Sequence, residues 1–209
     1  MNTREQQQDL PAELTYSEED LNQASARKVL AEGVYRFVVV GVKKSISKIQ
    51  TETDGSYKRG GNFSLSVECA PLDADNTPKR PTIFNNVTFP IKNPGVKDHK
   101  VPDTIGLCVQ FLSALGVKGI TAYPKKAGVG FMTSEGEVLD LEGYNSLKRQ
   151  INTNVMNYLK DAWKSPEQLI DETFYGQVAH NGEWRNITKQ WSELPEGEER
   201  KTSDFVDYQ

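Results

Sequence analysis

The chain has few of the side chains on which metal sites and covalent catalysis depend. Its 209 residues include two cysteines, Cys69 and Cys108, and two histidines, His99 and His180. The cysteines form no CxxC pair and the histidines are not at helical spacing, which argues against a zinc site. We interpret both cysteines, which lie in apolar periodic segments, as buried thiols rather than a disulfide. We interpret both histidines as surface residues.

Long apolar runs and the common nucleotide motifs are also absent. No stretch approaches the roughly 18 apolar residues of a membrane span, and the first residues, MNTREQQQDLPAEL, are too polar for a signal peptide. The sequence therefore predicts a cytoplasmic protein without a membrane partner. It contains no GxxxxGK[ST], no strand-linked GxGxxG and no GxSxG motif. Turn and cap positions explain its scattered aspartates better than a two-metal nuclease site does, so we expect no cofactor, no metal and no catalytic residue.

Charge is unevenly distributed along the chain. Residues 1–32 carry a net charge of −4, residues 33–191 carry +4, and residues 192–209 carry −4. Within the middle segment, residues 33–100 alone carry +5. A basic body between two acidic ends is typical of a protein with a polyanionic partner.

Alternating hydrophobicity predicts antiparallel strands in the basic body. Three runs, at 33–48, 62–72 and 82–93, have apolar side chains at every second position or on both faces. Gly41 falls inside the first run, where it indicates a bulge or a sharp bend. Asn181-Gly182 separates two later alternating runs and is the strongest hairpin signal in the chain.

Two helical segments interrupt these strands. The segment VPDTIGLCVQFLSALGVKG has Asp103 or Thr104 as a cap and Gly116 as a stop, and a second helix is predicted from about residue 145 to 164. The order of three strands, helices and a final hairpin favours a mainly β fold with helical insertions (α+β), a five-stranded Greek-key barrel of the OB type with flexible acidic N- and C-terminal segments. An antiparallel sheet packed on helices is the alternative.

This fold implies three parts. Residues 1–32 form an acidic N-terminal segment, and residues 192–209 form an acidic, disordered C-terminal tail. Residues 33–191 form the OB-like nucleic-acid-binding domain, with a helical insertion at about 118–171.

The loop GSYKRGG brings together groups that single-stranded nucleic acid requires. Tyr57 offers a ring for base stacking, and Lys58 and Arg59 offer positive charge for phosphates. A solvated loop tip is the competing interpretation, and edge-strand protection explains Lys43 and Lys44 equally well. Further cations lie near the same strands, and one of the two tryptophans of the last strand is expected to be exposed. The full predicted nucleic-acid-binding set is Arg36, Lys43, Lys44, Lys48, Tyr57, Lys58, Arg59, Lys79, Arg80 and Trp184.

The C-terminus combines acidic residues with an apolar tip. Many single-stranded DNA-binding proteins end in this way, with a tail that avoids the DNA and docks on partner enzymes. We therefore predict a partner-binding tail that consists of Asp204, Phe205, Val206, Asp207 and Tyr208.

The layout resembles the single-stranded DNA-binding proteins of bacteriophages, a group with OB folds. The resemblance is carried by GVYRFVVVGVKKS, NFSLSVECAPL, TIGLCVQFLSALG, FYGQVAHNGEWRNI and the acidic tail, and it covers roughly residues 33–191 plus the terminus. It implies sequence-tolerant, non-catalytic binding and protection of single-stranded DNA during phage replication or recombination. It also implies replication or recombination proteins as partners of the tail, and it leaves self-association open.

Three other functions remain compatible with the sequence. The first is a phage structural or protein-interaction module with the same sheet and no nucleic-acid partner. The second is a metal-dependent nuclease, in which divalent metal would turn binding into cleavage. The third is a host-defence inhibitor that sequesters a nucleotide.

Overall fold

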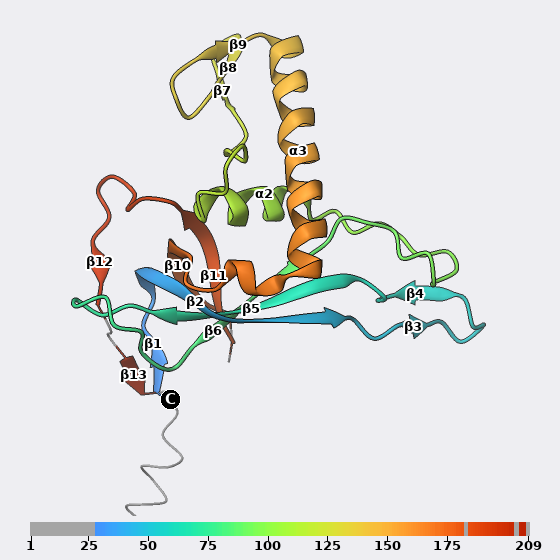
Figure 1. The fold of residues 1–209 in the computed structure, drawn as a ribbon, viewed down its shortest axis with the longest axis horizontal. Helices are drawn as coiled ribbons and strands as arrows, with labels where there is room; N and C mark the ends of the chain where they lie inside the picture. Colours follow the sequence, from blue (N-terminus) through green and yellow to red (C-terminus); the bar gives the residue numbers. More distant parts are fainter. Residues whose placement is uncertain (1–27, 182–183, 203–204, 208–209) are drawn as a thin grey trace, which may run out of the picture.

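A curled antiparallel sheet forms the centre of the computed structural model, which describes residues 28–181, 184–202 and 205–207 (Figure 1). The strand order is β11-β10-β2-β5-β6, and the short strand β12 joins β2 in parallel. The edge strands β6 and β11 contact each other, so the sheet closes into a half-barrel. The bounds are β2 Gly33–Ile46, β5 Phe63–Pro71, β6 Ile83–Thr88, β10 Thr173–Asn181, β11 Trp184–Trp191 and β12 Arg200–Lys201.

Strand β2 belongs to both halves of the sheet. Its first part pairs with β10 up to Val38, and its second part pairs with β5 from Phe37 onward. The register shifts between Val39 and Gly41, which confirms the predicted bulge. The inserted residue, Val40, is 41% exposed and directly follows the buried residues 37–39. A bulge of this kind bends the strand and lets it serve two differently oriented sheet segments.

The core fills the inside of the curl beneath two helices, α2 (Ile105–Ala114) and α3 (Leu141–Lys164). Phe174 stacks on Phe37 with ring centroids 5.6 Å apart and meets the edge of Phe111 at 5.7 Å. All three rings are buried, and burial of a side chain of this size stabilises the fold by about 1.5–3 kcal/mol. Cys69 and Cys108 are free, buried thiols, as predicted.

Both predicted helices are present, and their caps differ from the expectation. Thr104 is the N-cap residue of α2, but its hydroxyl donates to the carbonyl of Thr88 at 2.7 Å rather than capping the helix. Helix α3 begins four residues earlier than predicted, because the carboxylate of Asp140 accepts a 2.7 Å hydrogen bond from the backbone of Gly143. A 3-10 turn, η1 (Pro166–Leu169), follows α3.

The segment between the two helices forms a small sheet that lies at the far end of α3 from the barrel (Figure 1). Its strands are β7 (Lys125–Ala127), β8 (Gly130–Met132) and β9 (Val138–Leu139). Phe131 stacks on Tyr144 of α3 with ring centroids 4.1 Å apart, and Lys148 lies 5.8 Å from the centre of the Tyr144 ring. These contacts attach the small sheet to the start of α3.

The two ends of the described chain pair with each other. Strand β1 (Lys28–Leu30) is antiparallel to β13 (Phe205–Asp207). The guanidinium of Arg200 donates to the backbone oxygens of Leu72 at 3.2 Å and Asp73 at 2.5 Å. Strands β12 and β13 therefore lie in the segment for which we predicted an acidic tail without regular structure. Residues 1–27, Asp204 and Tyr208 lie outside the described residues.

Candidate nucleic-acid interface

The outer face of β2, β5 and β6 is lined by small polar side chains. Register places Lys43, Ser66 and Asn86 in one row across the three strands. The next row contains Ser64 and Thr88, whose hydroxyls lie 3.0 Å apart. Ser64 is only 8% exposed, whereas Lys43 and Asn86 at the two ends of the first row are exposed, so an extended polymer can contact the strands along the Lys43–Asn86 row.

Phe84 is the one large apolar side chain on this face of β6, and our sequence reasoning missed it. It is 52% exposed and lies opposite Glu68 of β5, whose carboxylate accepts a 2.9 Å hydrogen bond from Thr82. The alternation of the strand could have identified Phe84. Ile83 and Val87 face the core, so Phe84 must face outward. An exposed ring beside polar side chains is the element that base stacking requires.

The predicted loop at residues 49–61 is an ordered hairpin that extends the line of β2 and β5 (Figure 1). It consists of β3 (Gln50–Thr51) and β4 (Tyr57–Arg59). Lys58 pairs with Glu52 at 3.3 Å, both half-exposed, and Arg59 donates to the side chain of Gln50 at 2.7 Å. Exposed pairs of this kind contribute about 0–1 kcal/mol, so both cations can exchange these partners for phosphate.

A buried polar network fixes the base of the hairpin. His99, which we expected on the surface, is only 5% exposed. Its Nδ1 accepts from the backbone of Asn93 at 3.2 Å, and its Nε2 lies 2.9 Å from the side-chain oxygen of Asn62. The first contact requires an unprotonated Nδ1, so Nε2 carries the proton and donates to Asn62. Asn93 donates in turn to the carbonyl of Gly61 at 2.8 Å.

Tyr57 is part of this anchor. Its ring is half-buried with its centroid 5.6 Å from that of His99, and its hydroxyl donates to the carbonyl of Gly60 at 3.0 Å. Gly60 has a φ of 97°, and a Cβ at this position would lie 2.0 Å from the carbonyl oxygen of Lys48. Only glycine fits such a turn. The ring that we predicted to stack bases therefore has a structural role as well.

The structure separates the predicted cations into two groups. Lys43, Lys48 and Arg80 are exposed and make no ion pair with any residue that the structure describes. They lie respectively on the outer face, at the hairpin end and just before β6. Together with Lys58 and Arg59, they are distributed along the β2–β5–β6 face and its hairpin.

The remaining cations contact other parts of the chain. Arg36 donates to Asn76 and Thr173, both at 3.3 Å. Lys79 pairs with Asp73 at 2.8 Å. The ammonium of Lys44 bonds the carbonyl of Lys164 at the end of α3, where a cation complements the helix dipole. These three positions are distributed around the barrel, and the structure does not bring them together with the outer-face cations.

Trp184 begins β11, and its side chain lies outside the described residues. The same holds for the side chains of β13 in the predicted partner-binding tail. The roles of Trp184 and of the C-terminal tail therefore remain predictions from the sequence.

Local hydrogen bonding keeps two aspartates near the face ionised. The hydroxyl and the backbone N–H of Ser56 lower the pKa of the Asp54 carboxyl at the hairpin tip. The ammonium of Lys79, aided by the backbone of Thr77, lowers the pKa of Asp73. Both carboxylates would repel a polyanion at the hairpin tip and at the 73–78 turn.

Among the described residues, no group of three or more histidine, cysteine, aspartate or glutamate side chains is arranged to hold a metal ion. None of the helices described is long and apolar enough to cross a membrane. Comparison with known proteins finds no matching family model, curated protein or solved structure. The functional argument therefore depends on the geometry of this chain.

Proposed function

We propose that this chain is a non-catalytic protein that binds single-stranded DNA with little sequence preference. The observation that carries the proposal is the outer face of β2–β5–β6, where the exposed ring of Phe84 lies on a face of small polar groups near the unpaired Lys43. A face of this composition offers stacking and phosphate contacts at the same place. In the cell we place this activity in the host cytoplasm, in protection of single strands during phage replication or recombination.

The strand order supports an OB-type barrel. Three meandering strands, β2, β5 and β6, precede α2, and the β10–β11 hairpin follows and pairs back with β2. In OB folds, the second and third strands and the loops that flank them bind oligonucleotides. In this assignment, β5 and β6 are the second and third strands, and the β3–β4 hairpin is the first of those loops. The β10–β11 turn at 182–183 is the other loop and lies outside the described residues.

The length of the face fits a short segment of nucleic acid. Strand β5 has nine residues, which at about 3.3 Å per residue gives roughly 30 Å of surface, and the β3–β4 hairpin extends it. Single OB folds contact about 4–16 nucleotides, and this face accommodates the lower part of that range. The C-terminal residues after β12 would contact replication or recombination proteins, as the sequence predicts.

The test is fluorescence anisotropy of a labelled single strand of about thirty nucleotides, titrated with the full chain at low and moderate salt. We expect binding of the single strand that weakens with salt, and much weaker binding of the matching duplex. Addition of Mg²⁺ should leave the strand intact on a denaturing gel; cleavage would favour a nuclease. Absence of binding at low salt would overturn the proposal and favour a protein-interaction module.

A further inference from the structure

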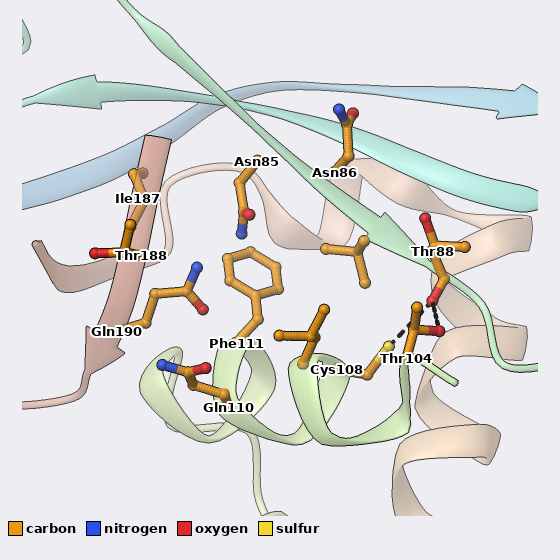
Figure 2. Close-up of a pocket in the computed structure, with 12 residues that line it drawn as sticks. Asn85, Asn86, Thr88, Thr104, Cys108, Gln110, Phe111, Ile187, Thr188 and Gln190 are labelled. Carbon is orange, nitrogen blue, oxygen red and sulfur yellow. Dashed lines mark hydrogen bonds between the residues drawn. The ribbon is translucent and has the colours of Figure 1, made fainter. Parts of the chain in front are cut away.

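A pocket of about 180 Å³ opens at the seam of the half-barrel, where the edge strands β6 and β11 meet above α2 (Figure 2). It is smaller than the roughly 300–1,000 Å³ of pockets for drug-sized ligands. It therefore has room for one planar fragment rather than for a whole nucleotide cofactor.

Three carboxamides from three different elements surround this pocket. Asn85 comes from β6, Gln110 from α2 and Gln190 from β11, and their side chains gather around the ring of Phe111 (Figure 2). None of the three carboxamides hydrogen-bonds another residue in the described part of the chain. Each one thus has a free donor and a free acceptor.

The position of Asn85 is unusual for a strand that lines a core. Its neighbours on the same side of β6, Ile83 and Val87, are both buried core residues. Gln190 pairs with Gly176 of β10, whose missing side chain leaves space for Phe37 and Ile187. Asn85, Gln110 and Gln190 are all partly exposed, and none of their side-chain atoms is a buried polar atom without a partner. The pocket therefore presents their carboxamide donors and acceptors to a polar ligand that enters it.

The lining also specifies the chemistry of the ligand. It contains no charged residue, and the rest of the lining consists of threonines, apolar residues, Cys108 and Asn86, whose side chain points away from the pocket (Figure 2). Phosphate or carboxylate would lack a cation here, whereas a flat, neutral ring with donors and acceptors on its edge would satisfy the carboxamides. Asparagine and glutamine pair with the N6–N7 edge of adenine through two hydrogen bonds.

We propose that this seam pocket binds one nucleobase, with adenine preferred, as a single base-selective contact within otherwise sequence-tolerant binding of the strand. The inference extends the proposed function, because β6 is an edge strand whose successive residues Asn85 and Asn86 point to opposite sides (Figure 2). Asn86 belongs to the outer face, in the row of Lys43. A base of a strand bound on that face reaches the pocket over the edge of β6 that has no hydrogen-bonded strand partner.

The experiment compares the wild-type chain with the double variant Gln110→Leu/Gln190→Leu, which keeps the size of the side chains and removes two carboxamides. Gln168→Leu is the matched control, because Gln168 is an exposed glutamine on η1, outside the pocket lining. The probes are an oligo-dA strand, an abasic strand of equal length, and free adenosine. Affinity is measured by anisotropy, and adenosine binding by the shift in melting temperature.

We expect the double variant to bind oligo-dA about 5- to 150-fold more weakly than wild type and the abasic strand equally well. Adenosine should raise the melting temperature of wild type and of Gln168→Leu but not of the double variant. If the double variant fails to fold, Asn85→Ser provides the same comparison.

The outcomes separate the two proposals. Oligo-dA binding that is identical in wild type and double variant would overturn the pocket and leave single-strand binding intact. Adenosine binding without binding of any strand would overturn single-strand binding, and it would identify the pocket as a site for free nucleosides. If neither strands nor adenosine bind, both proposals fail.

Discussion

Replacement of Phe84 by leucine tests the proposed binding face at one side chain. Leucine keeps the apolar contact of the half of the ring that packs on the sheet, and it removes the aromatic face. Phe84 is 52% exposed, and a phenylalanine offers roughly 200 Å² of surface. A stacked base would therefore cover about 100 Å², which corresponds to about 2.5 kcal/mol at 25 cal/mol per Å². This lies within the range of about 1–3 kcal/mol measured for stacked bases.

The expected result is a loss of affinity for single-stranded DNA of about 60-fold, within limits of about 5- to 150-fold. The ring is neutral, so the slope of log K against log salt should stay the same. Phe84→Tyr should retain the affinity, because it preserves the stacking surface. Leu141→Ala is the control, because Leu141 is 63% exposed at the start of α3, far from the face.

Anisotropy at four salt concentrations would give both quantities, and urea unfolding would show that the variants remain folded. An affinity of Phe84→Leu within twofold of wild type would refute the stacking role. Equal losses in Phe84→Leu and Leu141→Ala would show that the effect is not specific to this face.

Three further predictions test the charges, the anchor and the core. Lys43→Ala and Lys48→Ala should each reduce the salt slope of binding by about 1, since each removes one phosphate contact, whereas Lys126→Ala on β7 should not change it. His99→Ala should lower the free energy of unfolding in urea by about 1–3 kcal/mol, because it leaves buried amide groups without partners, and hydrogen exchange at 49–61 should accelerate. Burial raises the pKa of the Cys69 and Cys108 thiols from 9.0 to about 12, so the folded chain should not react with thiol reagents at pH 8.

The thiols also predict the direction of a pH dependence. Between pH 9 and 12 the thiols of the unfolded chain lose protons that the folded chain retains. The contribution of the thiols to the free energy of unfolding is therefore complete below pH 9 and falls as the pH rises. The loss is about 1.4 kcal/mol for each pH unit and each thiol. Cys108→Ala should reduce this slope by the contribution of one thiol in urea unfolding at pH 9–11, while burial, which also raises the pKa of Tyr123 and Tyr158, leaves a residual slope in the same direction. An unchanged salt slope in both lysine variants, unaltered exchange in His99→Ala, or rapid thiol modification would each contradict its prediction.

The barrel strands could be predicted from the sequence because their information is local. Alternation marked the strand at 62–72, and the structure has β5 at Phe63–Pro71. The glycine in the first strand marked the bulge at Val39/Gly41. One buried face fixes the phase of such strands, since a shift of one residue would turn every apolar side chain outward.

The anchor and the terminal pairing depend on contacts that no local pattern contains. His99 lies in the polar segment VKDHK, and it is buried only because Asn62 and Asn93 are brought to its two ring nitrogens. Strands β1 and β13 likewise pair segments from opposite ends of the chain. The ion pair between Lys58 and Glu52 could not be predicted either, because the two residues face each other across a hairpin that we expected to be a loop.

The two proposals meet at β6, and the register of this strand explains why. Its even-numbered residues Phe84, Asn86 and Thr88 face outward, whereas Ile83, Asn85 and Val87 face the core. Strand β6 pairs with β5 on one side only, and on the other side it contacts β11 without strand pairing, where the seam pocket lies. A nucleic acid with a base stacked on Phe84 therefore lies beside the edge of β6 from which the next residue, Asn85, reaches the pocket. Loss of stacking in Phe84→Leu should weaken strands of any base composition alike, whereas loss of the carboxamides should weaken adenine-rich strands most. Comparison of the two variants on oligo-dA and oligo-dT would therefore separate the outer face from the seam, and abasic DNA, which neither side chain should recognise, is the control.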